Sequence, residues 1–171
     1  MSPRWPLIKN EIRDHSVSNT FGMVRRYPNG ALKAHQGWDL SAVVGTPCYA
    51  IADGEVAFAG DAGDFGLIVV HSFQFTQYTY YAAYAHLQDA SVKKGDAVRK
   101  GQLIGHTGKS GNASNLPTPE YHLHFEIRAT PLPGLGLGGR VSPYAVYGVC
   151  PLNEAIDCPL EPAAPKEIAH A

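Results

Sequence analysis

The sequence predicts a mainly β protein, built as one antiparallel sheet or sandwich, and three observations support this. Short apolar runs alternate with turn-forming residues, 18 glycines and 13 prolines supply the turns, and no segment repeats apolar residues with a helical period. The chain has 171 residues, of which 44% are hydrophobic and 17% are charged. This length and composition are typical of a single domain with its own core.

Four apolar segments are the expected strands. Residues 55–59 follow a tight turn, and residues 67–71 form a second run of aliphatic side chains. The tyrosine-rich segment 78–86 suits a pleated, half-buried surface, which favours a strand there too. Residues 121–128 form the last apolar run. We expect short helices in the flanks of the chain.

The segments between these strands are rich in turn signals. Residues 92–105 contain a six-residue repeat, VKKGDA followed by VRKGQL, which predicts a sharply folded antiparallel sheet or a small barrel. Residues 106–119 are almost purely turn formers and predict a long surface loop. This loop lacks the glycine and lysine spacing of a phosphate-binding loop, so nucleotide binding is not expected. We expect residues 1–20 and 148–171 to be flanking arms of one domain at residues 21–147.

Charge and hydropathy exclude several classes of protein. The chain carries 14 Lys and Arg against 15 Asp and Glu, a net charge of −1, so it has no excess of cations for a nucleic-acid backbone. No apolar run approaches the roughly 18 residues of a membrane span. Residues 1–10 lack the apolar core of a Sec signal peptide. We expect no nucleic-acid partner and no membrane span.

The three cysteines form no metal or redox motif. Cys48 lies in an apolar segment and is expected to be a small buried hydrophobe. Cys150 and Cys158 are spaced for a short disulfide in an oxidising compartment, or they are two free thiols. The sequence leaves both alternatives open.

Two short patterns, HQGWD at 35–39 and HLH at 122–124, bring metal-ligand side chains together. Residues two apart in a strand point to one face, so His122 and His124 can face the same cleft. The conformational freedom of Gly37 lets the chain bend, so that His35 and Asp39 converge. A catalytic zinc ion takes three protein ligands and leaves one position open. His35, Asp39 and one histidine of the pair would supply this set.

These patterns resemble the H-x-G-x-D and H-x-H motifs of the lysostaphin/LytM-type zinc endopeptidases. The resemblance runs in order from residue 21, through YAHL at 84–87, the KKGD/RKGQ repeat and TGKS at 107–110, to residue 128. It implies an antiparallel β fold with a central cleft and a Zn²⁺ cofactor. It also implies that residues 21–147 form a zinc peptidase domain acting on the peptide cross-links of bacterial peptidoglycan.

The resemblance assigns roles to five residues. His35, Asp39 and His124 are the expected zinc ligands, and His86 and His122 are the expected catalytic pair beside the attacking water. A neutral imidazole can accept the proton of water and later protonate the leaving amine, because its unperturbed pKa of about 6.5 permits both states.

Other residues receive weaker assignments. Tyr27 is the nearest candidate for binding substrate or the oxyanion, with Arg25 and Arg26 as alternatives. Glu126 shares a strand face with the histidine pair and either orients a ligand or, as we favour, is a structural or rim carboxylate. Residues 71–84 and 112–121 are expected to border the cleft. The histidines expected to have ordinary structural or surface roles are His15, His71, His106 and His170.

The expected function is therefore zinc-dependent endopeptidase hydrolysis of peptidoglycan cross-links, by a monomer in the periplasm or outside the cell. The alternative is a non-catalytic peptidoglycan-binding or amidase-activating module on the same fold. The absence of an export signal suggests a secreted antibacterial toxin or lytic effector, delivered by a type VI-like route and neutralised by an immunity protein. A fragment of a longer secreted precursor would explain the same absence.

Overall fold

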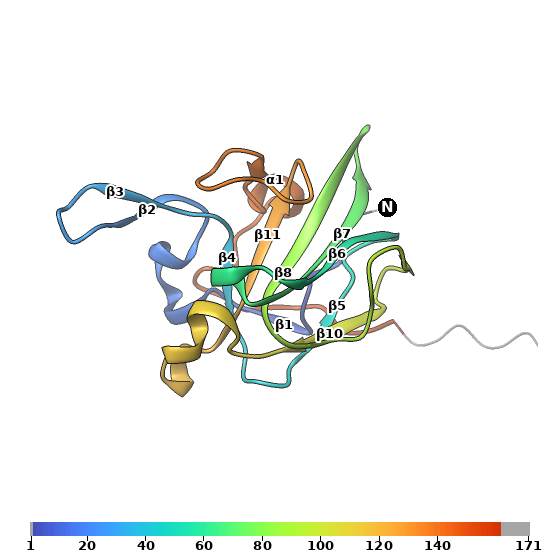
Figure 1. Cartoon of the computed structure of the whole chain (residues 1–171), viewed down its shortest axis with the longest axis horizontal. Coiled ribbons are helices and arrows are strands. Elements are labelled where there is room, and N and C mark those ends of the chain that lie inside the picture. Colours follow the sequence, from blue (N-terminus) through green and yellow to red (C-terminus); the bar gives the residue numbers. More distant parts are fainter. Residues whose placement is uncertain (1, 162–171) are drawn as a thin grey trace, which may run out of the picture.

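The computed structural model describes residues 2–161, which form almost only antiparallel strands (Figure 1), and this confirms the mainly β prediction. The strands are β1 (Lys9–Asn10), β2 (Gly22–Arg26), β3 (Leu32–His35), β4 (Trp38–Ser41), β5 (Pro47–Tyr49), β6 (Gly54–Asp61), β7 (Leu67–Phe75), β8 (Tyr78–Ala90), β9 (Ala97–Val98), β10 (Leu103–Thr107), β11 (His122–Arg128), β12 (Arg140–Val141) and β13 (Ile156–Asp157). The helical elements are the short α1 (Tyr144–Tyr147) and the 3₁₀ turns η1 (Arg13–His15), η2 (Val17–Asn19), η3 (Gly63–Phe65), η4 (Gly111–Asn115) and η5 (Thr118–Glu120). Each of the four expected strands is present.

One large sheet organises the molecule, with the strand order β12-β11-β8-β7-β6-β9. Strand β4 also pairs with β11, while β10 pairs with both β8 and β5. Strands β2 and β3 form a separate hairpin that projects from the body (Figure 1). Strand β11 therefore lies between β4 and β8, and its side chains are held from both sides.

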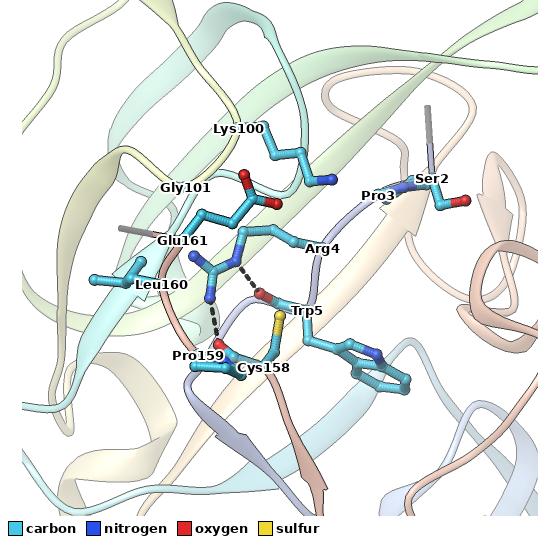
Figure 2. Close-up of a pocket in the computed structure, with 10 residues that line it drawn as sticks. All are labelled: Ser2, Pro3, Arg4, Trp5, Lys100, Gly101, Cys158, Pro159, Leu160 and Glu161. Carbon is cyan, nitrogen blue, oxygen red and sulfur yellow. Dashed lines mark hydrogen bonds between the residues drawn. The ribbon is translucent and has the colours of Figure 1, made fainter. Parts of the chain in front are cut away.

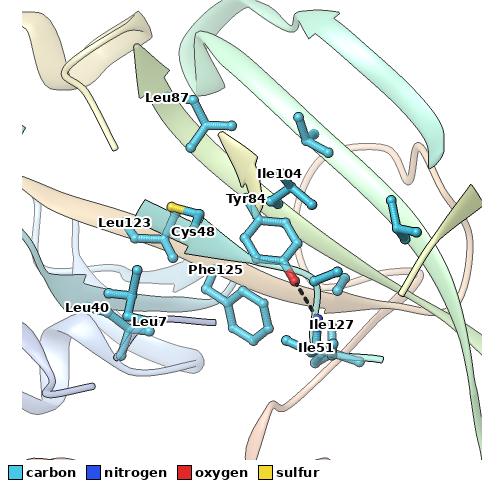
Figure 3. Packing of buried hydrophobic residues seen from close by; sticks show 14 of the residues in the cluster. Leu7, Leu40, Cys48, Ile51, Tyr84, Leu87, Ile104, Leu123, Phe125 and Ile127 are labelled. Carbon is cyan, nitrogen blue, oxygen red and sulfur yellow. Dashed lines mark hydrogen bonds between the residues drawn. The ribbon is translucent and has the colours of Figure 1, made fainter. Parts of the chain in front are cut away.

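The two faces of β11 have different roles. Leu123, Phe125 and Ile127 point into the main core and are fully buried there (Figure 3). The alternate residues, beginning with His122 and His124, point to the opposite face, as the period of two predicts. The core thus fixes the register that places both histidines on one surface.

The expected arms join the same core. Leu7 and Ile12 are buried in the main cluster, and β1 pairs with β13. Arg4 donates hydrogen bonds to the carbonyls of Trp5 and Cys158 across a pocket of about 560 Å³ (Figure 2). Both described flanks therefore pack on the domain. The rest of the expected C-terminal tail, residues 162–171 with His170, lies outside the described residues.

The structure also bears on the cysteines and on segment 71–84. Cys48 is buried, and Cys150 and Cys158 are free thiols, which is the second of the two alternatives. Segment 71–84 forms the β7–β8 hairpin, whose tip lies at the far end of β8 from His86 (Figure 1). The hairpin tip is thus remote from His86, and the expectation that this segment borders the cleft stays a prediction. No helix among residues 2–161 combines the length and apolar character needed to cross a membrane.

His71 is fully buried, and it makes the stability of the fold dependent on pH. Its ring contacts the Ser72 carbonyl at 2.9 Å and the Tyr84 hydroxyl at 3.1 Å, and burial lowers its pKa to about 4. The unfolded chain binds a proton near pH 6.5, whereas the folded chain does not until about pH 4. Stability should therefore fall as the pH falls through this window, with about 3 kcal/mol as the upper limit for this one group.

Urea unfolding of the wild type and of His71→Gln at pH 7 and pH 4.5 tests this expectation. The variant is less stable at pH 7, because it lacks part of the native packing, but it should lose less stability between the two pH values. Parallel losses in the two proteins would contradict it.

Candidate metal centre and active site

Three side chains from neighbouring strands form a compact cluster of metal donors. His35 ends β3, Asp39 lies on β4, and its register partner on β11 is His124. Asp39 Oδ1 lies 2.8 Å from His124 Nδ1 and 3.1 Å from His35 Nε2, and the two nitrogens are 3.3 Å apart. Donors bonded to one tetrahedral zinc ion at about 2.0–2.2 Å are separated by roughly 3–3.5 Å. The nitrogen and oxygen donors therefore fit a zinc ion in both chemistry and spacing.

Gly37 lets the β3–β4 turn lie directly against β11. A Cβ atom at this position would lie 2.2 Å from the Phe125 carbonyl oxygen and 2.9 Å from Glu126 Cγ. The φ angle of Gly37 is not positive, so the expected role of its conformational freedom is wrong. Glycine is required here because no side chain fits between the turn and the strand.

Hydrogen bonds hold the two histidines of the donor cluster in orientation. His35 Nδ1 donates to the Thr20 carbonyl at 2.8 Å, which leaves Nε2 facing Asp39. His124 Nε2 donates to Glu126 Oε1 at 2.9 Å, so its Nδ1 faces the cluster. Carbonyl and carboxylate oxygens only accept hydrogen bonds, so the proton of each ring lies on the nitrogen that faces them. This nitrogen is Nδ1 in His35 and Nε2 in His124.

His86 and His122 lie beside the donor cluster. Their rings are 5.2 Å apart at 83°, and His122 Nε2 lies 3.5 Å from Asp39 Oδ1. His86 Nδ1 donates to the Ser110 carbonyl at 2.9 Å, and His122 Nδ1 donates to the Glu120 carbonyl at 2.8 Å. In both rings the neutral tautomer leaves Nε2 free to accept a proton. The structure thus brings together all five residues to which the sequence assigned metal or catalytic roles.

The backbone of His86 is strained. Its φ is 61°, a left-handed conformation that a β-strand rarely contains. The neighbours of β8 shift register at this point, between Leu67 and Val69 of β7. Such strain costs on the order of 1–3 kcal/mol and is concentrated at functional sites. The irregularity turns the side chain toward the histidines of β11, and no residue pattern in the sequence signals it.

Burial and charge set the protonation of the site. Burial, with His124 and His122 nearby, lowers the pKa of His86 to about 3, and burial also lowers the pKa of His122. Burial would raise the pKa of Asp39, but hydrogen bonds with His124 and His35 hold it well below its usual value. Burial would lower the pKa of His124, but hydrogen bonds with Asp39 and Glu126 raise it to about 9. His86 and His122 are therefore neutral near pH 7.

The three candidates for substrate binding, Tyr27, Arg25 and Arg26, do not all lie at the metal-donor cluster. Tyr27 is half-exposed beside the β2–β3 hairpin, where Lys33 Nζ lies 5.4 Å from its ring centroid. Arg26 donates to the Gly30 carbonyl in the same hairpin. Arg25 instead reaches the metal-donor cluster, with Nη2 2.6 Å from Asp39 Oδ2. Arg25 is therefore the one of the three that orients a candidate ligand, and a role for Tyr27 toward substrate stays a prediction.

Glu126 is the residue whose environment differs most from expectation. It is 0% exposed and hydrogen-bonded to His124, so of the favoured assignment, a structural or rim carboxylate, the rim part is wrong and the structural part agrees with its burial. The alternative, a carboxylate that orients a ligand, matches its position. The alternation along β11 predicted that Glu126 shares a face with His124. The sequence does not show which side chains bond Glu126 in the interior.

One carboxylate and two imidazoles thus converge as candidate metal donors beside a second pair of histidines, on an antiparallel sheet. The model of Peptidase family M23 matches residues 33–134, and the chain belongs to this family. The match includes all five residues described above.

Curated relatives include a peptidoglycan endopeptidase and a cell division protein. The chain is 38% identical over 115 residues to peptidoglycan DD-endopeptidase ShyC of Vibrio cholerae, covering 65% of this chain and 24% of that protein. It is 33% identical over 128 residues to the cell division protein DipM of Caulobacter vibrioides, covering 74% of this chain and 18% of that protein. The chain thus spans about a quarter or less of the length of these relatives.

Solved structures of similar proteins show the same fold. A zinc-containing peptidase from Vibrio cholerae superposes with a TM-score of 0.60 at 30% identity, over 74% of this chain and 36% of that one. LytU superposes with a TM-score of 0.58 at 28% identity, over 74% of this chain and 79% of that one. The catalytic domain of lysostaphin from Staphylococcus simulans, at 24% identity and a TM-score of 0.58, shares the fold.

Proposed function

We propose that this protein is a zinc-dependent endopeptidase that hydrolyses peptide cross-links of bacterial peptidoglycan. The single observation that carries the proposal is the donor cluster of His35, Asp39 and His124, whose ligand atoms lie within 4.8 Å of one another beside His86 and His122. Family membership and the names of relatives such as ShyC supply the substrate class.

The five residues have separate roles in the proposed reaction. His35, Asp39 and His124 would hold the zinc ion, which when bound acts as a Lewis acid that polarises the scissile carbonyl and acidifies a water molecule. The free Nε2 of His122 or His86 accepts the proton of the attacking water and returns it to the leaving amine. The second imidazole uses its Nδ1 proton on a backbone carbonyl, so it can donate a hydrogen bond to the developing oxyanion only once its Nε2 is also protonated. The Ser110 and Glu120 carbonyls keep both rings oriented for these steps.

The alternative of a non-catalytic binding or amidase-activating module predicts a different site. Such a module needs neither three converging donors nor two further histidines with free ring nitrogens. Here all five side chains are buried and hydrogen-bonded around one point, with exposed fractions of 2–6%. Burying five ionisable groups is costly, and this favours the catalytic proposal.

Incubation of the protein with purified cross-linked muropeptides, followed by mass spectrometry, tests the proposed function. We expect cross-linked dimers to be converted to monomers, the conversion to stop when the protein is stripped with a chelator, and activity to return with zinc. Intact dimers with the zinc-loaded protein would contradict the proposal. Conversion that is insensitive to the chelator would contradict the zinc dependence.

We propose that the protein acts in the periplasm or on the extracellular wall, because peptidoglycan, the proposed substrate, lies there. A role as a secreted antibacterial toxin with an immunity partner stays a prediction. Expression in bacterial cytoplasm should be harmless, whereas fusion to a periplasmic signal should cause lysis that the His124→Ala variant does not. Equal harmlessness in both compartments would contradict the toxin prediction.

A further inference from the structure

We propose that Glu126, Arg128 and Arg140 form a buried clamp that positions His124 for the metal ion, and that Arg140 is its essential outer member. This inference rests on the proposed metal site and extends it to residues that lie outside the donor cluster. All three act through His124, so they are positioning residues.

The two carboxylate oxygens of Glu126 have separate partners. Oε1 accepts a hydrogen bond from His124 Nε2 at 2.9 Å. Oε2 is bonded at 2.6 Å by Arg128 Nε and at 2.9 Å by Arg140 Nε. The side chain of Glu126 is 0% exposed, and those of Arg128 and Arg140 are 3% and 1% exposed. Because both guanidinium groups hold Oε2, Oε1 is directed at the histidine.

The arginines are themselves fixed by backbone carbonyls beyond β11. Arg128 Nη1 donates to the Pro131 carbonyl at 3.0 Å. Arg140 Nη1 donates to the carbonyls of Gly134 at 2.7 Å and Gly136 at 2.9 Å. The loop between β11 and β12 therefore anchors the clamp from outside.

Arg140 lies beyond the segment that matches the family model, which ends at residue 134. Its guanidinium bonds the carboxylate through Nε and two carbonyls through Nη1, which requires the planar fork of arginine. A lysine at this position keeps the charge but cannot make these three contacts together. The carbonyls of Gly134 and Gly136 would then no longer hold the positive charge beside Glu126 Oε2.

The clamp has a consequence for metal binding that a purely structural ion pair would not have. A histidine ligand whose outer ring nitrogen is held by a carboxylate is kept in one orientation and tautomer, and loss of such a partner weakens metal binding by about 10–100-fold. If the clamp opens, the His124 ring is free to rotate away from Asp39 and His35. Zinc affinity should therefore depend on Arg140, although Arg140 makes no contact with the donor cluster.

The test is the zinc dissociation constant of the full chain, measured by competition with a chromophoric chelator, for the wild type, Arg140→Met and Arg140→Lys. We expect both variants to bind zinc measurably more weakly than the wild type, by less than the roughly 10–100-fold that loss of the carboxylate itself would cost, because Arg128 still bonds Oε2. Arg99→Met, which removes an exposed arginine, is the matched control and should bind as the wild type does. Phe73→Leu alters the buried core near the β7–β8 tip and serves as the control for lost stability.

Thermal unfolding of the zinc-free proteins separates the two roles. A lower melting temperature in Arg140→Met with wild-type zinc affinity would overturn the proposal, because it would show a structural ion pair alone. Weaker zinc binding in Arg140→Lys, beyond any change in Phe73→Leu, supports it even if Arg140→Met fails to fold. A wild type that binds zinc but cleaves no muropeptide would refute the proposed function and leave the clamp standing. A wild type that binds no zinc would overturn both.

Discussion

Replacement of His124 by alanine should abolish zinc binding and reduce muropeptide hydrolysis to background. The substitution removes the donor that is hydrogen-bonded to Asp39 and leaves the fully buried Glu126 without its histidine partner. Two donors remain, which is fewer than the three that a catalytic zinc site uses. The measurements are the zinc content per chain after dialysis and the release of monomers from cross-linked muropeptides.

His106→Ala is the matched control for this prediction. His106 is partly exposed and bonded to Asp89, outside the metal-donor cluster. This variant should keep one zinc ion per chain and the wild-type rate. Retention of zinc and full activity by His124→Ala would show that the donor cluster is not the catalytic metal site.

Replacement of His122 or His86 should have the opposite signature, with zinc retained and turnover lost. Neither residue is needed to complete the three-donor set, and with Nδ1 bonded to a backbone carbonyl each leaves Nε2 for the proposed proton transfer. Loss of a positioned general acid or base costs about 10²–10⁴-fold in rate. We expect a fall in kcat of this size for His122→Ala and His86→Ala, with a zinc affinity close to that of the wild type.

Steady-state kinetics on a defined cross-linked peptide, beside a zinc titration of each variant, check this expectation. His106→Ala again serves as the control for loss of an imidazole elsewhere. Loss of zinc in His122→Ala would make this residue a ligand and not a catalytic base. Unchanged kcat in both variants would remove the histidine pair from the mechanism.

The fold and most of the site could be predicted because they depend on local patterns. Apolar runs with turn residues between them predicted the main strands, and alternation along 122–126 placed two histidines on one face. Local spacing also indicated His35, Asp39 and one histidine of the pair as donors, and the resemblance to the lysostaphin/LytM-type family then selected His124. These features depend on residues a few positions apart, and such spacing is visible in a sequence.

The features that could not be predicted depend on contacts between distant segments. The irregularity in β8 that aims His86 arises from its pairing with two neighbouring strands. The need for Gly37 arises from the carbonyl of Phe125, 88 positions away, and not from its own backbone angles. The burial of Glu126 depends on Arg140 and the loop before it. None of these partners is encoded by a local motif.

The proposed function requires His35, Asp39 and His124 to hold one catalytic zinc ion. The most direct measurement is a crystal structure of the zinc-loaded protein with anomalous data collected on both sides of the zinc absorption edge. We expect one strong anomalous peak, at about 2.0–2.2 Å from His35 Nε2, Asp39 Oδ1 and His124 Nδ1. A zinc ion bound elsewhere, or no peak among these three atoms, would contradict it.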